Sequence, residues 1–179
     1  MYLKRTFYLK NMISKSCIKL IEVYFETLDF VDVLDVKLGY VVVKYDENKI
    51  TKVEISNYFE KIGFSEIVNP DIILVEKIKL AAIELIYLAN NTNSLLRNSD
   101  YISERVQEPY SKIGRVFSSV TNMTLEKYLI LLKVEKTKEL IQQNEYSFSE
   151  ISYMLGYSSV QYLSNQSKYM TKIQLTDFQ

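Results

Sequence analysis

The residues best suited to hold a ligand lie between positions 147 and 164, where two short amphipathic segments flank a turn that contains glycine. Ser147 and Glu150 stand three positions apart, which is the spacing of a helix-capping pair, and Gly156 is expected to end that first helix. A helix, a tight turn and a second helix can place polar side chains against base edges in the major groove of DNA. A plain helical hairpin has the same spacing, so spacing alone does not distinguish it from a DNA-binding helix-turn-helix.

Two residue types that carry much of protein chemistry are scarce in this chain. Histidine is absent, and Cys17 is the one cysteine. Without imidazole the sequence excludes hydrolases that use histidine as the base and histidine-ligated metal or haem sites. One thiol excludes an internal disulfide, and four glycines in the whole chain argue against a phosphate-binding loop. We therefore expect no enzyme and no cofactor.

The composition limits the classes of protein to which the chain can belong. The 179 residues are enough for one ordinary domain or two small ones, and 47% hydrophobic with 25% charged residues is typical of a globular chain. The 22 basic and 22 acidic residues cancel, so binding to nucleic acid would have to depend on local arrangement. The N-terminus lacks the apolar segment of a signal peptide, and charged residues interrupt the apolar stretch 72–89. We expect no membrane span and a cytoplasmic location.

The first 69 residues alternate between the two periods of regular structure. Thr51 and Glu54 have the spacing of a capping box, Gly63 suits a left-handed helix end, and Gly39 interrupts a run of apolar residues. The order β-α-β-β-α-β predicts a ferredoxin-like unit. We expect strands at 3–9, 30–36, 40–45 and 64–68, and helices from residue 17 onward and over 51–63.

The rest of the chain is expected to be helical. Pro70 marks a boundary, because proline tolerates the first turn of a helix, and a long helix is predicted over 71–90. The wide apolar stripe of this helix predicts burial against another body, and a second copy of the chain gives a homodimer through residues 71–90. A polar linker follows at 90–94. The predicted domains are 1–69, a connecting helix and linker over 70–93, and 94–179.

The segment 147–164 resembles the second helix-turn-helix of the AraC/XylS-type transcription regulators. It matches their pattern at Ser147, Glu150, Ile151, Gly156, Tyr157, Tyr162, Leu163 and Ser164, with Ser152 where alanine is usual. Residues 101–104 and 110–117 resemble the first helix-turn-helix, and 126–141 the helix that joins the two. The resemblance covers about residues 97–179 and implies an α+β protein that ends in an all-α double helix-turn-helix domain.

The resemblance breaks down towards the C-terminus. Phenylalanine, glycine, threonine and proline positions of the family are held by Ser167, Lys172, Gln174 and Leu175, and Asn122 replaces a glycine in the first half. Loss of a core aromatic predicts a looser second unit. Residues 93–179 carry ten basic and nine acidic residues, whereas phosphate neutralisation normally supplies much of the affinity for DNA.

Carried over by position, the resemblance implies double-stranded DNA as the partner and two sets of base-reading residues. Arg115 would pair with guanine, and Gln161 or Asn165 with adenine. The alternative is that these residues form ordinary solvated helix surface. The candidate site residues are Ser111, Lys112 and Arg115 in the first recognition helix and Val160, Gln161, Ser164 and Asn165 in the second.

The N-terminal unit resembles the heavy-metal-associated ferredoxin-like domain with a degenerate CxxC motif. Ser14 replaces the first cysteine and leaves Cys17 alone, with Met12 as the other conceivable soft ligand. A single thiolate does not hold Cu(I) or Zn(II) tightly, so no metal is expected. Three interpretations follow: a sequence-specific transcription regulator of unknown effector, a protein-interaction module with degenerate helix-turn-helix units, and a thiol-based metal or redox sensor through Cys17.

Overall fold

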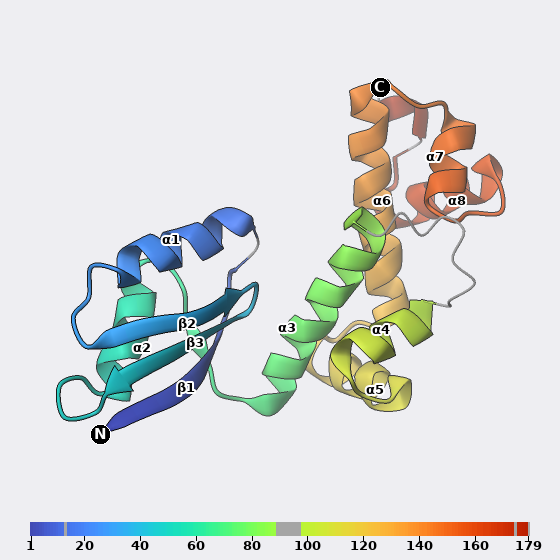
Figure 1. Ribbon diagram of the computed structural model, residues 1–179. Helices are drawn as coiled ribbons and strands as arrows, with labels where there is room; N and C mark the ends of the chain where they lie inside the picture. Colours follow the sequence, from blue (N-terminus) through green and yellow to red (C-terminus); the bar gives the residue numbers. More distant parts are fainter. Residues whose placement is uncertain (13, 89–97, 174, 179) are drawn as a thin grey trace. The chain divides into compact units, whose positions relative to one another are not determined.

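The computed structural model describes residues 1–12, 14–88, 98–173 and 175–178 (Figure 1). The chain divides into two units, Met1–Leu80 and Ala81–Gln179, and the division falls within helix α3 (Pro70–Ile83). The predicted linker at 90–94 and the domain boundary at residue 93 lie outside the described residues. Among the described helices, none is both long enough and apolar enough to cross a membrane.

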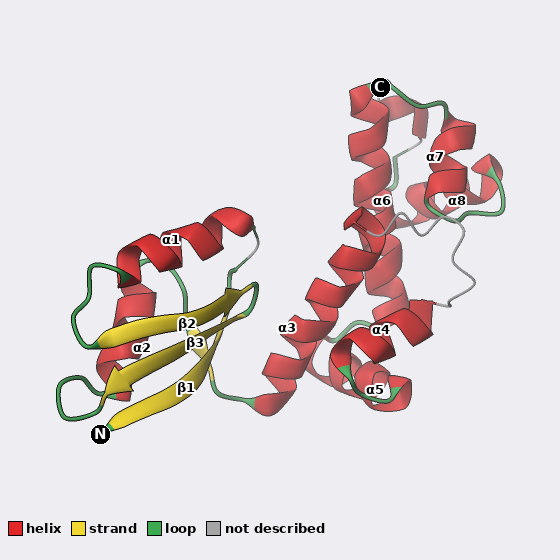
Figure 2. Cartoon of the chain, viewed as in Figure 1, coloured by secondary structure: helices red, strands yellow, loops and turns green. Residues whose placement is uncertain are grey.

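The N-terminal unit is a four-stranded antiparallel sheet with two helices, and its elements follow the predicted order (Figure 2). The strands lie side by side in the order β2-β3-β1-β4. The last strand is shorter than predicted, because only Glu66 and Ile67 pair with β1. The elements are β1 (Tyr2–Leu9), α1 (Lys15–Phe25), β2 (Val31–Lys37), β3 (Tyr40–Asp46), α2 (Lys52–Lys61) and β4 (Glu66–Ile67).

The strand register places alternate apolar side chains in one core. β1 and β3 pair from Tyr2 opposite Asp46 to Tyr8 opposite Tyr40. Because side chains alternate along a strand, one face of the sheet carries the buried residues and packs on the two helices. The rings of Phe25 in α1 and Phe59 in α2 stack with centroids 4.5 Å apart. The strand residues of this core are Phe7, Leu9, Val31, Val41, Val43 and Tyr45.

Local sequence explains both ends of α2. The Thr51 hydroxyl accepts a hydrogen bond from the Glu54 amide, and the Glu54 carboxylate accepts one from the Thr51 amide, so the predicted capping box is confirmed. Gly63 lies in the left-handed region at φ +90°, and the Phe64 amide donates to the Phe59 carbonyl five residues back. This Schellman arrangement satisfies a carbonyl that the helix end would leave without a partner.

The long helix predicted over 71–90 is interrupted. α3 begins at Pro70, where the Asn69 side chain accepts from the Asp71 amide, and passes into a π-helical segment, η1 (Glu84–Leu88). Leu85 is buried where η1 packs against α4 and α6. This part of the apolar stripe is therefore covered within the chain and does not need a second copy to bury it.

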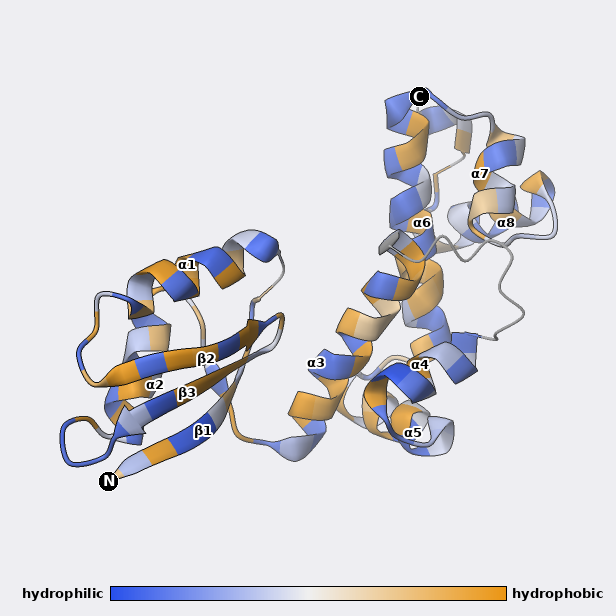
Figure 3. Cartoon of the chain, viewed as in Figure 1, coloured by the Kyte–Doolittle hydropathy of each residue, from blue (hydrophilic) through white to orange (hydrophobic). Residues whose placement is uncertain are grey.

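The second unit is helical, as predicted. Its elements are α4 (Asn98–Val106), α5 (Tyr110–Thr121), α6 (Leu125–Gln143), α7 (Phe148–Met154), α8 (Val160–Thr171) and the 3₁₀ segment η3 (Leu175–Phe178). Hydrophobic and hydrophilic residues interleave along α6 (Figure 3), which packs against α5, α7 and α8. α6 is thus the element that joins the two helix pairs.

Gly63→Ala should lower the free energy of unfolding by about 1 kcal/mol, because a Cβ disfavours the left-handed conformation. No described atom lies within 4 Å of the position such a Cβ would take, so the loss of stability would come from the backbone conformation and not from a steric clash. Gly63→Asn should cost less, since asparagine tolerates this region. Urea denaturation followed by circular dichroism measures both, with Gly114→Ala, in a helix and equally open, as a control that loses no stability. Equal stability of the alanine variant and the parent would contradict the role of Gly63.

Candidate functional site

Two helix pairs, α4–α5 and α7–α8, share the same turn geometry (Figure 1). After the first helix of each pair one residue is left-handed, Gln107 at φ 60° and Gly156 at φ 68°. The next amide donates to a carbonyl five residues back, from Glu108 to Ser103 at 3.3 Å and from Tyr157 to Ser152 at 2.9 Å. The chain therefore contains the same helix-ending turn twice.

The second helices of the two pairs correspond residue by residue. α5 ends at left-handed Asn122, φ 55°, and α8 ends at left-handed Lys172, φ 64°, 50 positions later. The hydroxyls of Thr121 and Thr171 donate to the carbonyls four residues back at 2.7 and 2.8 Å. Asn122, which stands where the family pattern has glycine, adopts the left-handed conformation that asparagine tolerates.

Side-chain caps fix where the second pair begins its helices. Ser147 and Glu150 form the predicted capping box at the start of α7. The Ser159 hydroxyl accepts from the Tyr162 amide at 3.1 Å and so caps α8. Both caps satisfy amides that would otherwise lack partners, which makes the two helix starts properties of the local sequence.

The candidate residues on α5 lie on the side away from its buried residues. Ile113, Val116 and Phe117 are buried, whereas Ser111 and Arg115 are exposed. Lys112 is half-buried, and its ammonium group lies 2.6 Å from the carboxylate of Glu108. Arg115 has no ion-pair or hydrogen-bond partner among the described residues, so its guanidinium can donate paired hydrogen bonds to a ligand. The charge that α5 offers without competition is therefore that of Arg115.

The candidate residues on α8 also share a face. Gln161 and Asn165 are exposed and one turn apart, and the Gln161 amide nitrogen donates to the Asn165 oxygen at 3.0 Å. That bond leaves the Gln161 oxygen and the Asn165 amide nitrogen available to a ligand. Val160 and Ser164 are half-buried. The residues of each predicted set thus lie together on one helix, and among the described residues no hydrogen bond or ion pair joins the two sets.

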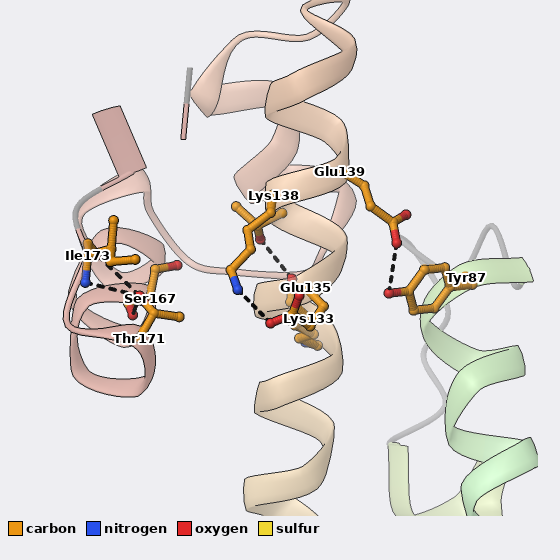
Figure 4. Close-up of polar contacts among 9 residues, drawn as sticks. Tyr87, Lys133, Glu135, Lys138, Glu139, Ser167, Thr171 and Ile173 are labelled. Carbon is orange, nitrogen blue, oxygen red and sulfur yellow. Dashed lines mark hydrogen bonds and ion pairs between the residues drawn. The ribbon is translucent and has the colours of Figure 1, made fainter. Parts of the chain in front are cut away.

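The core beneath α8 differs from the core beneath α5. Phe117 is buried and its ring lies 5.3 Å from that of Tyr128, centroid to centroid. Ser167, at the corresponding position, is fully buried, and its hydroxyl has no hydrogen-bond partner among the described residues (Figure 4). Leu175 is buried like its counterpart Leu125, so that departure from the family pattern keeps a core side chain; Gln174 lies outside the described residues.

A half-buried lysine of α6 lies beside the second turn. The Nζ atom of Lys133 lies 5.1 Å from the centre of the Tyr157 ring, and burial lowers the pKa of Lys133. Burial also raises the pKa of Tyr157 to about 12, and its hydroxyl has no hydrogen-bond partner in the described part of the chain. Sequence reasoning missed Lys133, because a lysine in an amphipathic helix is usually exposed. Its place after Leu131 and Leu132, in an apolar run, was the available signal.

Hydrogen bonds and an ion pair link η1 to α4 and α6. Arg105 of α4 donates two hydrogen bonds to the Glu84 carboxylate, at 2.7 and 3.0 Å. The Tyr87 hydroxyl donates to Glu139 of α6 at 3.3 Å (Figure 4). The Nζ atom of Lys136 lies 4.9 Å from the centre of the Tyr87 ring. Burial, followed by the nearby Glu139 charge, raises the pKa of Tyr87 to about 12. No sequence pattern predicts these pairs, because their members lie far apart in the chain.

The N-terminal loop does not build the donor set of a soft-metal site. Cys17 Sγ lies 3.6 Å from the Ser14 hydroxyl and 4.0 Å from the Asn11 carbonyl. Met12 is buried in the core of the sheet. No cluster of three or more histidine, cysteine, aspartate or glutamate residues that could hold a metal was found among the described residues. The second ligand considered from the sequence is thus a core residue.

No protein-family model and no curated protein matches the sequence. Several solved structures resemble it in part. One is a transcriptional regulator with an AraC-type DNA-binding domain from Chromobacterium violaceum, with 23% identity, a TM-score of 0.48, and coverage of 56% of this chain and 88% of that one. The C-terminal domain of the response regulator AraT from Geobacillus stearothermophilus has 17% identity, a TM-score of 0.49, and coverage of 62% and 84%.

A third similar structure is the DNA-binding domain of the transcriptional factor AdpA in complex with a target DNA. It has 16% identity and a TM-score of 0.47, and the match covers 58% of this chain and 87% of that one. TM-scores below 0.5 are too low to assign a function to this chain. Its function must therefore be inferred from its own residues.

Ser167→Ala should raise the free energy of unfolding by about 1 kcal/mol, because it removes a buried hydroxyl that lacks a partner. Thr137→Val is the matched control, since the equally buried Thr137 hydroxyl donates to the Lys133 carbonyl at 2.8 Å. This control should lower stability, so the two variants should change it in opposite directions. Calorimetry of the full chain measures both. A loss of stability in Ser167→Ala would mean that the serine hydroxyl is satisfied after all.

Proposed function

We propose that this chain is a DNA-binding transcription regulator that reads the major groove with α5 and α8. One observation carries the proposal: the helix, Schellman turn and second helix occur twice at a fixed spacing, with polar side chains on the outer face of each second helix. The residues that resemble the AraC/XylS pattern support it, since Gly156 takes the left-handed turn conformation and Ser147 caps the preceding helix. A plain helical hairpin requires neither the repeat nor the exposed polar faces.

On α5, Arg115 is the residue that identifies a base. Its guanidinium can donate two hydrogen bonds to O6 and N7 of guanine, the commonest specific contact in the major groove. Ser111 lies one turn earlier on the same exposed face and suits a phosphate or base-edge contact. Lys112 is held by Glu108, so it supplies less charge to a phosphate than an unpaired lysine would.

On α8, Gln161 and Asn165 form the reading pair. Their mutual hydrogen bond pre-orients both amides and leaves one acceptor and one donor, the pattern that matches N6 and N7 of adenine. Val160 and Ser164 flank the pair, and the valine methyl groups suit a thymine methyl. α8 reads mainly by neutral hydrogen bonds, whereas α5 uses a charged group.

The remaining parts of the proposal concern the N-terminal unit and assembly. We infer that Met1–Leu80 is ferredoxin-like; its β-α-β-β-α-β order and its strand order β2-β3-β1-β4 support this. A homodimer through residues 71–90 stays a prediction. Because Leu85 is already covered by α4 and α6, such a dimer would use exposed side chains of this helix such as Ile83.

A protein-interaction module is the second candidate function. The unpartnered hydroxyl of Ser167 favours it, and so do the exposed rings of Tyr153, Tyr162 and Tyr169 around α7 and α8. The near-neutral charge of residues 93–179 favours it too, because few cations remain for phosphates. Selection of bound fragments from a genomic DNA library at increasing salt separates the two: a discrete motif whose binding weakens with salt supports DNA reading, and its absence at low salt supports protein binding.

Arg115→Ala should cost about 1–3 kcal/mol of specific DNA-binding free energy and relax the preference for guanine at one position. Fluorescence anisotropy with the selected DNA site and its single-base variants measures both effects. Arg5→Ala, which removes an exposed arginine from the N-terminal sheet, is the matched control and should leave binding unchanged. Equal affinity of Arg115→Ala and the parent for every DNA would remove this residue from the site.

Gln161→Ala should relax the preference at a different base pair, because α8 reads DNA separately from α5. The same set of base variants is used, so the two substitutions should affect different positions of the site. Tyr153→Ala, on the exposed side of α7, serves as the control for loss of a surface side chain. If Gln161→Ala changes no preference while Arg115→Ala does, α5 alone reads sequence.

A further inference from the structure

The edge of the N-terminal sheet carries a groove that DNA binding does not use. The groove has a volume of about 570 Å³ and lies between α1 and β2, which run next to each other in Figure 1. Its apolar lining includes Phe25, Leu28 and Val33, which belong to or pack on the core of this unit. A helix and an edge strand thus form two walls around an apolar floor.

The strand that forms one wall has an open edge. β2 is an edge strand, and among the described strands it pairs with β3 alone, so its other side offers amide and carbonyl groups to a further strand. A bulge between Val33 and Asp35 interrupts the pairing with β3, and Leu34 is exposed there. Because edge bulges limit long pairings, a strand that adds to β2 must be short.

The groove is acidic although the chain as a whole is neutral. Residues 22–36 hold five carboxylates and no lysine or arginine. The Nζ atom of Lys19 lies 3.6 Å from Glu22 Oε2, and that of Lys37 lies 3.8 Å from Asp35 Oδ2. The charges of Glu22 and Asp35 are therefore partly neutralised. Glu26 and Asp32 have no ion-pair partner among the described residues, and both line the groove. Their charge is therefore available to a bound cation.

The register decides on which side an added strand would meet each charge. Asp32 pairs opposite Lys44 and Asp35 opposite Val42, which places both aspartates on the sheet face away from the helices. Glu22 and Glu26 come from α1 on the helix side. Because side chains of an added strand alternate between the two faces, every second residue would meet the aspartates, and the others would meet the apolar floor and the glutamates.

We propose that this groove binds a short extended peptide of alternating apolar and basic residues, which adds to β2 as a further strand. Main-chain hydrogen bonds to the open edge give affinity, and the carboxylates select lysine or arginine side chains. The same charges disfavour other occupants: a nucleic acid is repelled, and two copies of this acidic edge repel each other. The occupant is therefore a basic segment of another protein.

The test measures binding of the full chain to a fluorescein-labelled peptide in which valine and lysine alternate over seven residues. We expect saturable binding that weakens about tenfold in Glu26→Gln/Asp32→Asn, because Asp32 loses its pair with a lysine of the peptide and the loss of the Glu26 charge reduces the overall attraction of the groove for a basic peptide. Glu47→Gln/Glu60→Gln removes two exposed carboxylates outside the groove and is the matched control, with binding unchanged. Circular dichroism of both double variants shows that they are folded.

Two further peptides separate strand addition from simple charge attraction. A peptide with glutamate in place of lysine should not bind, and one with N-methylated alternate amides should bind at least about tenfold less tightly, because it cannot complete the ladder. Equal binding of the methylated peptide, an equal loss in the control variant, or no binding of the basic peptide would each overturn the proposal. Light scattering of the full chain tests whether a second copy of the chain occupies the groove. A dimer that dissociates in Glu26→Gln/Asp32→Asn would assign the groove to that copy and overturn the proposal. DNA binding by these variants should match the parent, so this test and that of the proposed function fail independently.

Discussion

Both helix pairs depend on the packing of one long helix, α6. Its buried side chains run from Leu125 at its start to Ile141 near its end. Near the start, Phe117 of α5 packs on Tyr128; near the end, Leu140 and Ile141 share a core with residues of α7 and α8. Because α6 is a continuous helix of 19 residues, it fixes the separation of α5 and α8. A weakened contact at either end would therefore move one set of outward-facing residues relative to the other.

The two ends of α6 are not equally well packed. The first pair is closed by an aromatic contact. The second encloses the hydroxyls of Ser167 and Tyr157, which have no hydrogen-bond partner among the described residues, and the half-buried Lys133 lies over the Tyr157 ring. Buried polar groups without partners reduce stability, so the second pair should open locally at a lower free energy than the first. The same asymmetry is present on the surface, where α5 presents a free guanidinium and α8 a pair of neutral amides. Under the proposed function, α5 would anchor the protein and α8 would refine the choice of site.

The overall neutrality of the chain conceals a separation of charge. Within the N-terminal unit, residues 22–36 contain five acidic residues, four of which line a groove, whereas basic and acidic residues nearly balance in the second unit. Net charge therefore says little about partners in this protein, because a binding surface responds to charges within about one Debye length. Under the two proposals, the N-terminal unit would bind a basic peptide and the second unit would bind DNA, so the two ligands would occupy separate surfaces of one chain.

The sequence alone determined features that depend on a few neighbouring residues. The capping boxes at Thr51 and Ser147, the left-handed ends at Gly63, Gly156 and Asn122, and the order of elements were all predictable, because hydrogen bonds within five residues fix them. The family resemblance implied the place of Arg115 in the recognition helix, and its side chain is exposed there. Tertiary structure decided the shortness of β4, the π-helical η1, the Arg105–Glu84 and Tyr87–Glu139 bonds, the contact between Lys133 and Tyr157, and the groove between α1 and β2. Each of these features depends on how one element packs against another, which the residues of a single element do not specify.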